Sequence, residues 1–356
     1  MATLPLRFPT TRTPTQPSTG VDSPRPRALY LMEPRFLNLV YGREARVRLE
    51  HCLEFSLPPQ TKAGHQDLTA EQRAGIELII TSWDMPVLTP EFLALYPRLK
   101  AVFFGAGSVR RIVTPASWQR GVRMISAAHA NALPVAEFAF AHIILGLKRV
   151  WPQAAAARSQ RRFVRTGAVP AGTYGTTVGL LALGHVGRLV ARRLQSLDVK
   201  VLGYDPFVSA ADMVELGVHP AGLDELFARS QVVSCHLPHL PETESFIRGT
   251  HFESMPPDAV FINTARGEVV AETEMLDVLR RRTDLFAVID VTSPEPPRTE
   301  SPLFDLPNVL LTPHIAGSLG AECLRLGDSI AADVERYVRG ESIANEVFER
   351  DMARHA

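Results

Sequence analysis

The 356-residue chain has few cysteines, no net charge and no apolar run close to the ~18 residues that cross a membrane. Cys52, Cys235 and Cys323 are scattered and odd in number, so they predict no disulfide framework and favour a reduced, cytoplasmic setting. Lys plus Arg equals Asp plus Glu, at 38 each, so the bulk charge does not favour nucleic acid or a membrane as a partner. The N-terminus lacks the apolar core of a signal peptide, and its Thr- and Pro-rich composition predicts a disordered tail over residues 1–26.

The most informative segment is 177–207, which combines an apolar strand, a glycine turn, an amphipathic helix and a second strand that ends on Asp205. This order is typical of the dinucleotide-binding βαβ unit. Gly184 would let the backbone approach a pyrophosphate, and Gly187 would let the helix pack close to the strand. Free N–H groups at the start of the helix favour the anion. Asp205 lies at the usual distance of about 20 residues, where it can accept hydrogen bonds from a ribose.

One position of the glycine turn departs from the usual pattern. Ala182 occupies the place of the first glycine in G-x-G-x-x-G. Because Ala is the mildest replacement for Gly, we expect a slightly altered turn and not a lost site. An empty βαβ unit of a doubly wound sheet is the alternative interpretation.

Short predicted strands and helices alternate along the rest of the chain, which indicates parallel sheets covered by helices. A long helix is expected from about 134 to 158. Because the βαβ unit starts near the middle of the chain, the ordered residues before it must form a domain of their own. We therefore predict a first domain of residues 27–130 and 318–356, which includes the last helix, and a dinucleotide-binding domain of residues 131–317.

Three polar residues follow successive predicted strands, where ligands bind in open α/β sheets. Arg266 can hold a carboxylate in a fork and polarise the adjacent carbonyl. His314 can exchange a proton near neutral pH, and Glu295 can orient its ring. Each residue alone is more often an ion-pair partner, a solvated loop acid or a capping group. Their shared position favours hydride transfer involving a nicotinamide and a 2-oxo acid.

From about residue 76 to 346 the chain resembles the NAD-dependent D-2-hydroxyacid dehydrogenase family. The segments that carry the resemblance are A-G-S-V at 106–109, V-A-E at 135–137, the unit at 177–207, H-L-P-x-x-P-E-T at 236–243, N-T-A-R-G at 263–267, D-V-x-x-x-E-P at 290–296 and N-V-L-L-T-P-H-I-A-G at 308–317. The resemblance implies an α/β fold in which a doubly wound parallel-sheet dinucleotide-binding domain is inserted in a flavodoxin-like substrate domain. It also implies a catalytic trio of Arg266, Glu295 and His314.

The βαβ unit and the resemblance together give a set of residues expected to bind NAD. These are Gly184, His185, Val186, Asp205, Pro206, Leu237, Pro238, Thr243, Thr264, Ala265, Arg266, Asp290, His314 and Gly317. The substrate carboxylate is expected at Ala106, Gly107 and Arg266, and Trp83 either lines the substrate pocket or belongs to the core. The implied partners are a small 2-oxo or 2-hydroxy acid and a second copy of the chain in a homodimer, with no nucleic acid and no membrane.

Several further features leave alternatives open. Cys235, His236 and His239 lie close together, but no second cluster completes a tetrahedral zinc site, so we expect no metal. The basic run 158–165 suggests a solvated helix end or a subunit contact. Ala271 stands where the family often has Asp, which predicts an uncapped helix. A dinucleotide-sensing interaction protein, or a dehydrogenase of another small anion such as phosphite, are the alternative functions. Glu295 disfavours formate as the anion, because that branch of the family is expected to have Gln beside the His.

Overall fold

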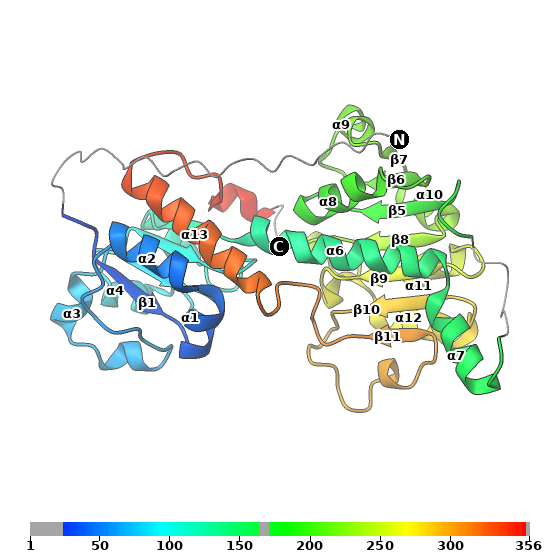
Figure 1. Cartoon of the computed structure of the whole chain (residues 1–356), viewed down its shortest axis with the longest axis horizontal. Helices are drawn as coiled ribbons and strands as arrows, with labels where there is room; N and C mark the ends of the chain where they lie inside the picture. Colours follow the sequence, from blue (N-terminus) through cyan, green and yellow to red (C-terminus); the bar gives the residue numbers. More distant parts are fainter. Residues whose placement is uncertain (1–23, 164–170, 354–356) are drawn as a thin grey trace, which may run out of the picture.

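The computed structural model describes residues 24–163 and 171–353, which form two lobes, each built on its own sheet (Figure 1). The predicted disordered tail, 1–26, lies almost entirely outside the described residues, and so does the end of the basic run 158–165. Both sheets are mainly parallel and are covered by helices, which confirms the predicted α/β class. The division of the chain after 130 and after 317 stays a prediction.

The first sheet has the strand order β1-β2-β3-β4-β12. Its strands are β1 (Ala28–Leu31), β2 (Leu78–Thr81), β3 (Ala101–Phe104), β4 (Arg123–Ser126) and β12 (Glu346–Val347). The first four are parallel and almost completely buried, as expected for strands covered on both faces, and β12 is antiparallel to β4. Isolated bridges from Glu54 and Gln60 place a further extended segment beside β1, which gives the sheet a flavodoxin-like outline.

Helices cover both faces of this sheet. They are α1 (Pro34–Val40), α2 (Arg43–Cys52) and α13 (Glu322–Val338) on one face, and α3 (Ala70–Ala74), α4 (Pro90–Leu95) and α5 (Pro115–Gln119) on the other. Helix α4 begins after Thr89, a residue type that caps helices well, and the Thr89 side chain accepts a hydrogen bond from the amide of Phe92. The last helix returns from the far end of the chain to pack against α1 and α2.

The second sheet has the strand order β11-β10-β9-β8-β5-β6-β7, and all its strands are parallel. They are β5 (Thr177–Leu181), β6 (Lys200–Tyr204), β7 (His219–Pro220), β8 (Val232–Cys235), β9 (Val260–Asn263), β10 (Phe286–Ile289) and β11 (Val309–Leu311). The chain order reverses on either side of β5, which makes the carboxyl end of β5 the switch point where dinucleotides bind in such sheets. The longer strands lie where apolar runs such as 178–183, 259–263 and 309–311 predict strands, to within a few residues. The two-residue strands β7 and β12 were not predicted, because so short a segment has no detectable periodicity.

The helices of the second lobe are α6 (Ala128–Leu147), α7 (Val150–Gln160), α8 (His185–Leu194), α9 (Ala210–Glu215), α10 (Leu223–Arg229), α11 (Gly249–Ser254) and α12 (Glu272–Arg281). The single helix predicted over 134–158 is wrong in extent. It is divided at Arg149, which has a left-handed φ of 52°, and α6 already begins before Pro134. Pro134 disfavours a helix at this point because it has no backbone N–H to donate. Burial of Ala130 and Ala132 in the first turns nevertheless favours the helical conformation there.

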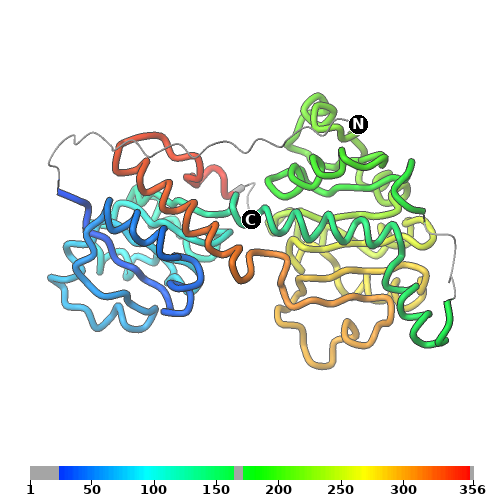
Figure 2. Tube along the Cα trace, in the orientation of Figure 1, coloured from blue at the N-terminus to red at the C-terminus, as the bar shows by residue number. Residues whose placement is uncertain are grey.

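Helix α6 and the segment 312–321 are the two ordered crossings between the lobes (Figure 2). By length and composition alone α6 could span a membrane, which the sequence analysis did not expect. However, half of its apolar window is buried inside the protein, and it packs against α8, β8, β9 and α13. Its apolar surface is therefore used for packing between the two sheets.

Candidate active site

The glycine turn between β5 and α8 is tight at one glycine and open at the other. A Cβ atom at Gly187 would lie 2.1 Å from the carbonyl oxygen of Ala182, so only Gly allows α8 to approach the strand this closely. At Gly184, which is the N-cap of α8, an added Cβ would meet no atom within 4 Å. No side chain caps this helix, so the first N–H groups of α8 face a space that can receive an anion.

Asp205 follows β6 and fixes the shape of the glycine turn. Its Oδ2 accepts a hydrogen bond of 2.7 Å from the amide of Leu183, and its Oδ1 accepts one of 2.8 Å from the amide of Phe207. Each carboxylate oxygen still has a second lone pair for a ligand hydroxyl. Asp205 also lines an open groove of about 440 Å³ with Tyr204 and Pro220. This groove lies where the βαβ unit would place the adenosine of a dinucleotide.

Three buried polar atoms near the carboxyl ends of the second sheet have no hydrogen-bond partner within the described residues. They are Thr264 Oγ1, His236 Nδ1 and Ser318 Oγ. Buried polar groups normally find a partner, so these three atoms, which follow β9, β8 and β11, are available to a polar ligand. Burial lowers the pKa of His236 to about 4, so this ring is neutral at physiological pH. The residues present therefore fit a polar cofactor such as NAD.

The loop after β8 is held by one threonine. Thr243 Oγ1 donates to the carbonyl of Pro238 over 2.6 Å and accepts from the amide of Leu240 over 2.8 Å. Leu237 is buried at the base of this loop. His185 and Val186 are the first two residues of α8, while Pro206 is exposed just beyond β6. These predicted cofactor residues thus follow β8, β5 and β6, three adjacent strands.

His314 and Glu295 form a close pair past the ends of β11 and β10. His314 Nδ1 lies 2.7 Å from Glu295 Oε1, and both side chains are nearly half exposed. The amide of His314 donates to the carbonyl of Asp290 over 3.0 Å, and its backbone has a left-handed φ of 54°. Because Nδ1 faces the carboxylate, Nε2 is left for proton exchange with a ligand.

Asp290 holds the loop that carries His314. Its Oδ1 accepts from Thr312 Oγ1 over 2.6 Å and from the amide of Ile315 over 2.8 Å, while its Oδ2 accepts from the amide of Ala316 over 2.9 Å. The side chain is only 2% exposed. Asp290 therefore positions the histidine loop, and at most a small part of its hydrogen-bonding capacity is left for a nicotinamide amide.

Arg266 directly follows the β9 segment N-T-A. Its guanidinium donates to the carbonyl of Ala265 over 2.6 Å, and its own carbonyl accepts from Asn263 Nδ2 over 2.8 Å. Burial, and next the positive charge of Arg111, lower the pKa of Arg266, and the charge of Glu295 acts in the opposite direction. Arg266, Glu295 and His314 follow β9, β10 and β11, which are adjacent strands of the parallel sheet, so the three residues lie past the same edge of that sheet.

The first lobe contributes the loop after β3. Ser126 Oγ donates to the carbonyls of Ala106 and Gly107, which holds the loop in place. Within the described residues, the amide of Gly107 makes no hydrogen bond, so it can bind an anion. Trp83, in contrast, packs against Phe36 with ring centroids 5.3 Å apart and contacts the apolar clusters on both faces of the first sheet. The structure thus shows core contacts for Trp83.

Asn131 is a further residue of the site that was not predicted from the sequence. This residue of α6 accepts a hydrogen bond of 3.0 Å from the amide of Ser318 through its Oδ1 and lies next to Gly107 and Gly317. It therefore joins the two crossings between the lobes to the proposed substrate loop. Its role depends on contacts between positions nearly 190 residues apart, and no local pattern could have indicated it. Ala271 was anticipated correctly, because α12 begins there without a side-chain cap.

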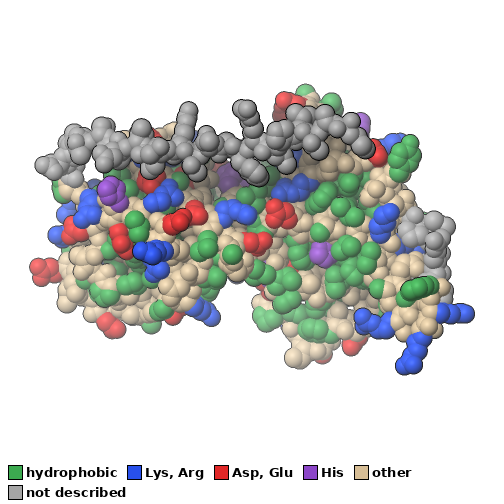
Figure 3. Space-filling view, in the orientation of Figure 1, with side chains coloured by type: hydrophobic (Ala, Val, Ile, Leu, Met, Phe, Trp, Pro, Cys, Tyr) green, Lys and Arg blue, Asp and Glu red, His purple; other side chains and the backbone are tan. Residues whose placement is uncertain are grey.

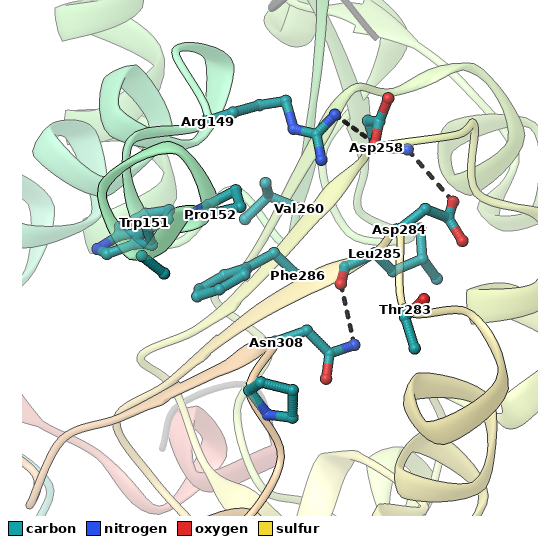
Figure 4. Close-up of a pocket in the computed structure, with 12 residues that line it drawn as sticks. Arg149, Trp151, Pro152, Asp258, Val260, Thr283, Asp284, Leu285, Phe286 and Asn308 are labelled. Carbon is teal, nitrogen blue, oxygen red and sulfur yellow. Dashed lines mark hydrogen bonds and ion pairs between the residues drawn. The ribbon is translucent and has the colours of Figure 1, made fainter. Parts of the chain in front are cut away.

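Other features of the surface lie apart from these strand ends. Across the part of the chain that the structure describes, no group of three His, Cys, Asp or Glu side chains could hold a metal. Positive and negative side chains are interspersed on the face shown in Figure 3. A cavity of about 210 Å³ lies at the opposite, amino ends of β9 and β10 (Figure 4). There Arg149 pairs with Asp258 and Trp151 stacks on Phe286, which anchors α7 to the sheet.

Comparisons with known proteins indicate the class of enzymes that this chain resembles. Residues 141–316 match the NAD-binding domain of the D-isomer specific 2-hydroxyacid dehydrogenases. D-3-phosphoglycerate dehydrogenase of Mycobacterium tuberculosis is 34% identical over 257 residues, which are 72% of this chain and 48% of that protein. The structure is similar to a phosphoglycerate oxidoreductase from Rhizobium etli, with 22% identity and a TM-score of 0.77 over 92% of this chain and 100% of that one. It is also similar to D-lactate dehydrogenase from Aquifex aeolicus complexed with NAD and lactic acid, with 24% identity and a TM-score of 0.68 over 88% and 96%.

Residues 141–316 of the chain therefore belong to the NAD-binding domain of the D-isomer specific 2-hydroxyacid dehydrogenase family. The expected family, fold class and NAD cofactor are thereby confirmed. The chain spans about half the length of the curated relatives it matches.

Proposed function

We propose that this protein transfers a hydride between NAD(H) and a small 2-hydroxy or 2-oxo acid. The observation that carries the proposal is the 2.7 Å contact between His314 Nδ1 and Glu295 Oε1, which lie past the ends of β11 and β10, next to the strand β9 that precedes Arg266. The nicotinamide, when bound, supplies the redox chemistry. The protein has to orient the acid, polarise its carbonyl and move one proton.

Each residue of the trio has a separate task in this proposal. Arg266 binds the substrate carboxylate and the neighbouring oxygen, because a planar guanidinium matches two coplanar acceptors. His314 gives its Nε2 proton to the carbonyl oxygen in reduction and takes it back in oxidation. Glu295 stabilises the charged ring through Nδ1 and holds it in place. The amide of Gly107 completes the carboxylate site from the first lobe.

The finer assignments are also proposals. The names of the relatives make D-3-phosphoglycerate one substrate to test beside simple 2-hydroxy acids. We further propose that Gly184, Asp205, Thr243, Thr264 and Gly317 contact NAD. A homodimer and a cytoplasmic location agree with the family and with the three free cysteines. Light scattering of the purified chain tests the dimer.

The test is an assay of NADH consumption with a panel of 2-oxo acids, and of NAD reduction with D-3-phosphoglycerate. We expect His314→Ala to lower turnover by about 10²- to 10⁴-fold, the range of general acid–base catalysis, with unchanged NADH binding. His219→Ala, an exposed histidine on the edge strand β7, is the matched control and should behave as wild type. Near-normal turnover of the His314 variant would remove this residue from the mechanism.

A dinucleotide-sensing interaction protein is the second candidate, since the same fold can bind NADH without reducing anything. It predicts NADH binding but no turnover of any acid in the panel. The Glu295–His314 pair disfavours this function, because sensing needs no proton donor. Oxidation of phosphite in the same assay would instead support the small-anion alternative.

A further inference from the structure

The peptide unit that joins Ala106 to Gly107 is held from one side by a buried serine. Ser126, at the end of β4, is 3% exposed, and its Oγ donates to the carbonyl of Ala106 over 3.2 Å and to that of Gly107. In a trans peptide the N–H points away from the C=O. The bond to the Ala106 carbonyl therefore turns the amide of Gly107 away from Ser126. This is the amide that the proposed function assigns to the substrate carboxylate.

Ser126 is held in turn by a residue from the far end of the chain. Its backbone amide donates to the carbonyl of Asn345 over 3.0 Å, at the point where β12 begins to pair with β4. The Ser126 hydroxyl also accepts from the amide of Ala128, the first residue of α6, over 3.1 Å. Ser126 thus joins the loop after β3, the start of the last strand and one crossing between the lobes.

A buried carboxylate anchors the side chain of Asn345. The Nδ2 of Asn345 donates to Oδ2 of Asp333 over 2.7 Å and lies 3.4 Å from Oγ of Ser329, one turn earlier on α13. Asp333 is only 2% exposed. An apolar residue of similar size would avoid the cost of burying a carboxylate, so packing alone does not account for Asp333. An ionised acceptor also makes a hydrogen bond about twice as strong as a neutral one.

We propose that Asp333 is a positioning residue for the substrate carboxylate. Together with Asn345 and Ser126 it forms a relay that sets the orientation of the Gly107 amide. The inference rests on the proposed role of this amide, and it extends that role to a side chain of α13 and to the end of the first sheet. Loss of the Asp333 carboxylate loosens the loop after β3, so the oxo acid binds less tightly. The cofactor and the proton-exchanging histidine belong to the other lobe and are unaffected.

The first measurement is the steady-state kinetics of the full chain with NADH and the 2-oxo acid that it reduces best. Asp333→Ala should raise the KM for the oxo acid by about 3- to 30-fold, the range of coupling through such networks, with little change in kcat or NADH affinity. Asp333→Asn keeps a neutral acceptor of the same shape and should lie between wild type and Asp333→Ala. It replaces the Ala variant if that variant does not fold. Asp328→Ala, at an exposed acid of the same helix, is the matched control and should behave as wild type.

A double-mutant cycle tests whether Asp333 acts through Ser126. In the Ser126→Ala background, which lacks the hydroxyl, Asp333→Ala should raise the KM no further, because the relay is already interrupted. Additive losses in the double variant would overturn the proposal. So would a KM of both Asp333 variants like that of the control, or losses of kcat and NADH affinity as large as the change in KM.

Hydrogen exchange of the unliganded full chain separates this inference from the proposed reaction. The amides of Gly105 and Ala106 each donate over 2.8 Å, to the carbonyls of Thr81 and Phe104, so their exchange reports the order of the loop. Segment 104–110 should exchange about 3- to 30-fold faster in Asp333→Ala than in the control. Unchanged exchange there would overturn the proposal. If the wild type reduces no 2-oxo acid, the proposed function fails, and the exchange result alone decides whether the relay holds the loop.

Discussion

Replacing Ala182 by Gly tests whether the departure from the glycine fingerprint is a strained but tolerated turn. Ala182 has a left-handed φ of 68°, the conformation that the fingerprint glycine adopts without cost. For an L residue this backbone costs about 1–2 kcal/mol. The substitution to Gly removes that cost, which stabilises the fold. It also loses a buried methyl group worth about 0.8 kcal/mol, and the greater conformational entropy of Gly favours the unfolded chain by about 0.4–1 kcal/mol. The terms nearly cancel, so the unfolding free energy should stay close to that of the wild type.

The matched control is Ala191→Gly, at a fully buried position inside α8. Here no backbone strain is relieved, and the loss of helix propensity adds about 1 kcal/mol to the lost methyl. Urea unfolding followed by circular dichroism should therefore show Ala191→Gly to be less stable than Ala182→Gly by about 1–2 kcal/mol. The reasoning about the turn is wrong if both variants lose the same stability.

Three other predictions concern the two glycines of the turn, Arg266 and His236. Gly184→Ala should leave the melting temperature nearly unchanged and weaken NADH binding. Gly187→Ala, whose Cβ would meet the carbonyl of Ala182, should lower both the melting temperature and the NADH affinity. Equal effects of the two variants on the melting temperature would contradict the difference in free space around the two glycines. Arg266→Lys keeps the charge but loses the fork, so kcat/KM for any accepted 2-oxo acid should fall by at least about tenfold with little change in NADH affinity, and retention of most of the efficiency would exclude the clamp. Burial lowers the pKa of His236 in the folded protein from the ordinary 6.5 to about 4, so its contribution to stability is present above pH 6.5 and is lost as the pH falls towards 4. His236→Asn should reduce that acid sensitivity by up to roughly 3 kcal/mol, and an unchanged slope between these pH values would refute it.

Much of the second lobe could be predicted from local sequence. A buried parallel strand must be a continuous apolar run, and a dinucleotide turn needs glycines at fixed spacing, so β5 and α8 were identified correctly. Asp205 directly follows β6, as expected, and its contact with NAD stays a prediction. Caps are local too, because Thr89 and Ser209 need only reach an amide three residues on. Arg266, Glu295 and His314 were each predicted to follow a strand. Because the strands are parallel and adjacent, their carboxyl ends lie at one edge of the sheet.

The tertiary structure decided what depends on contacts between distant segments. The helix predicted over 134–158 starts early and breaks at Arg149 because packing against both lobes, and not local propensity, sets its limits. The three hydrogen bonds accepted by Asp290 reach residues 312–316, and the role of Asn131 spans the two crossings. The hydrogen bonds that join Asp333, Asn345 and Ser126 tie the last helix and strand to the loop after β3. Periodicity and spacing describe a residue's neighbours along the chain, so the sequence by itself determined the elements and the chemistry, and only folding decided which of these groups meet.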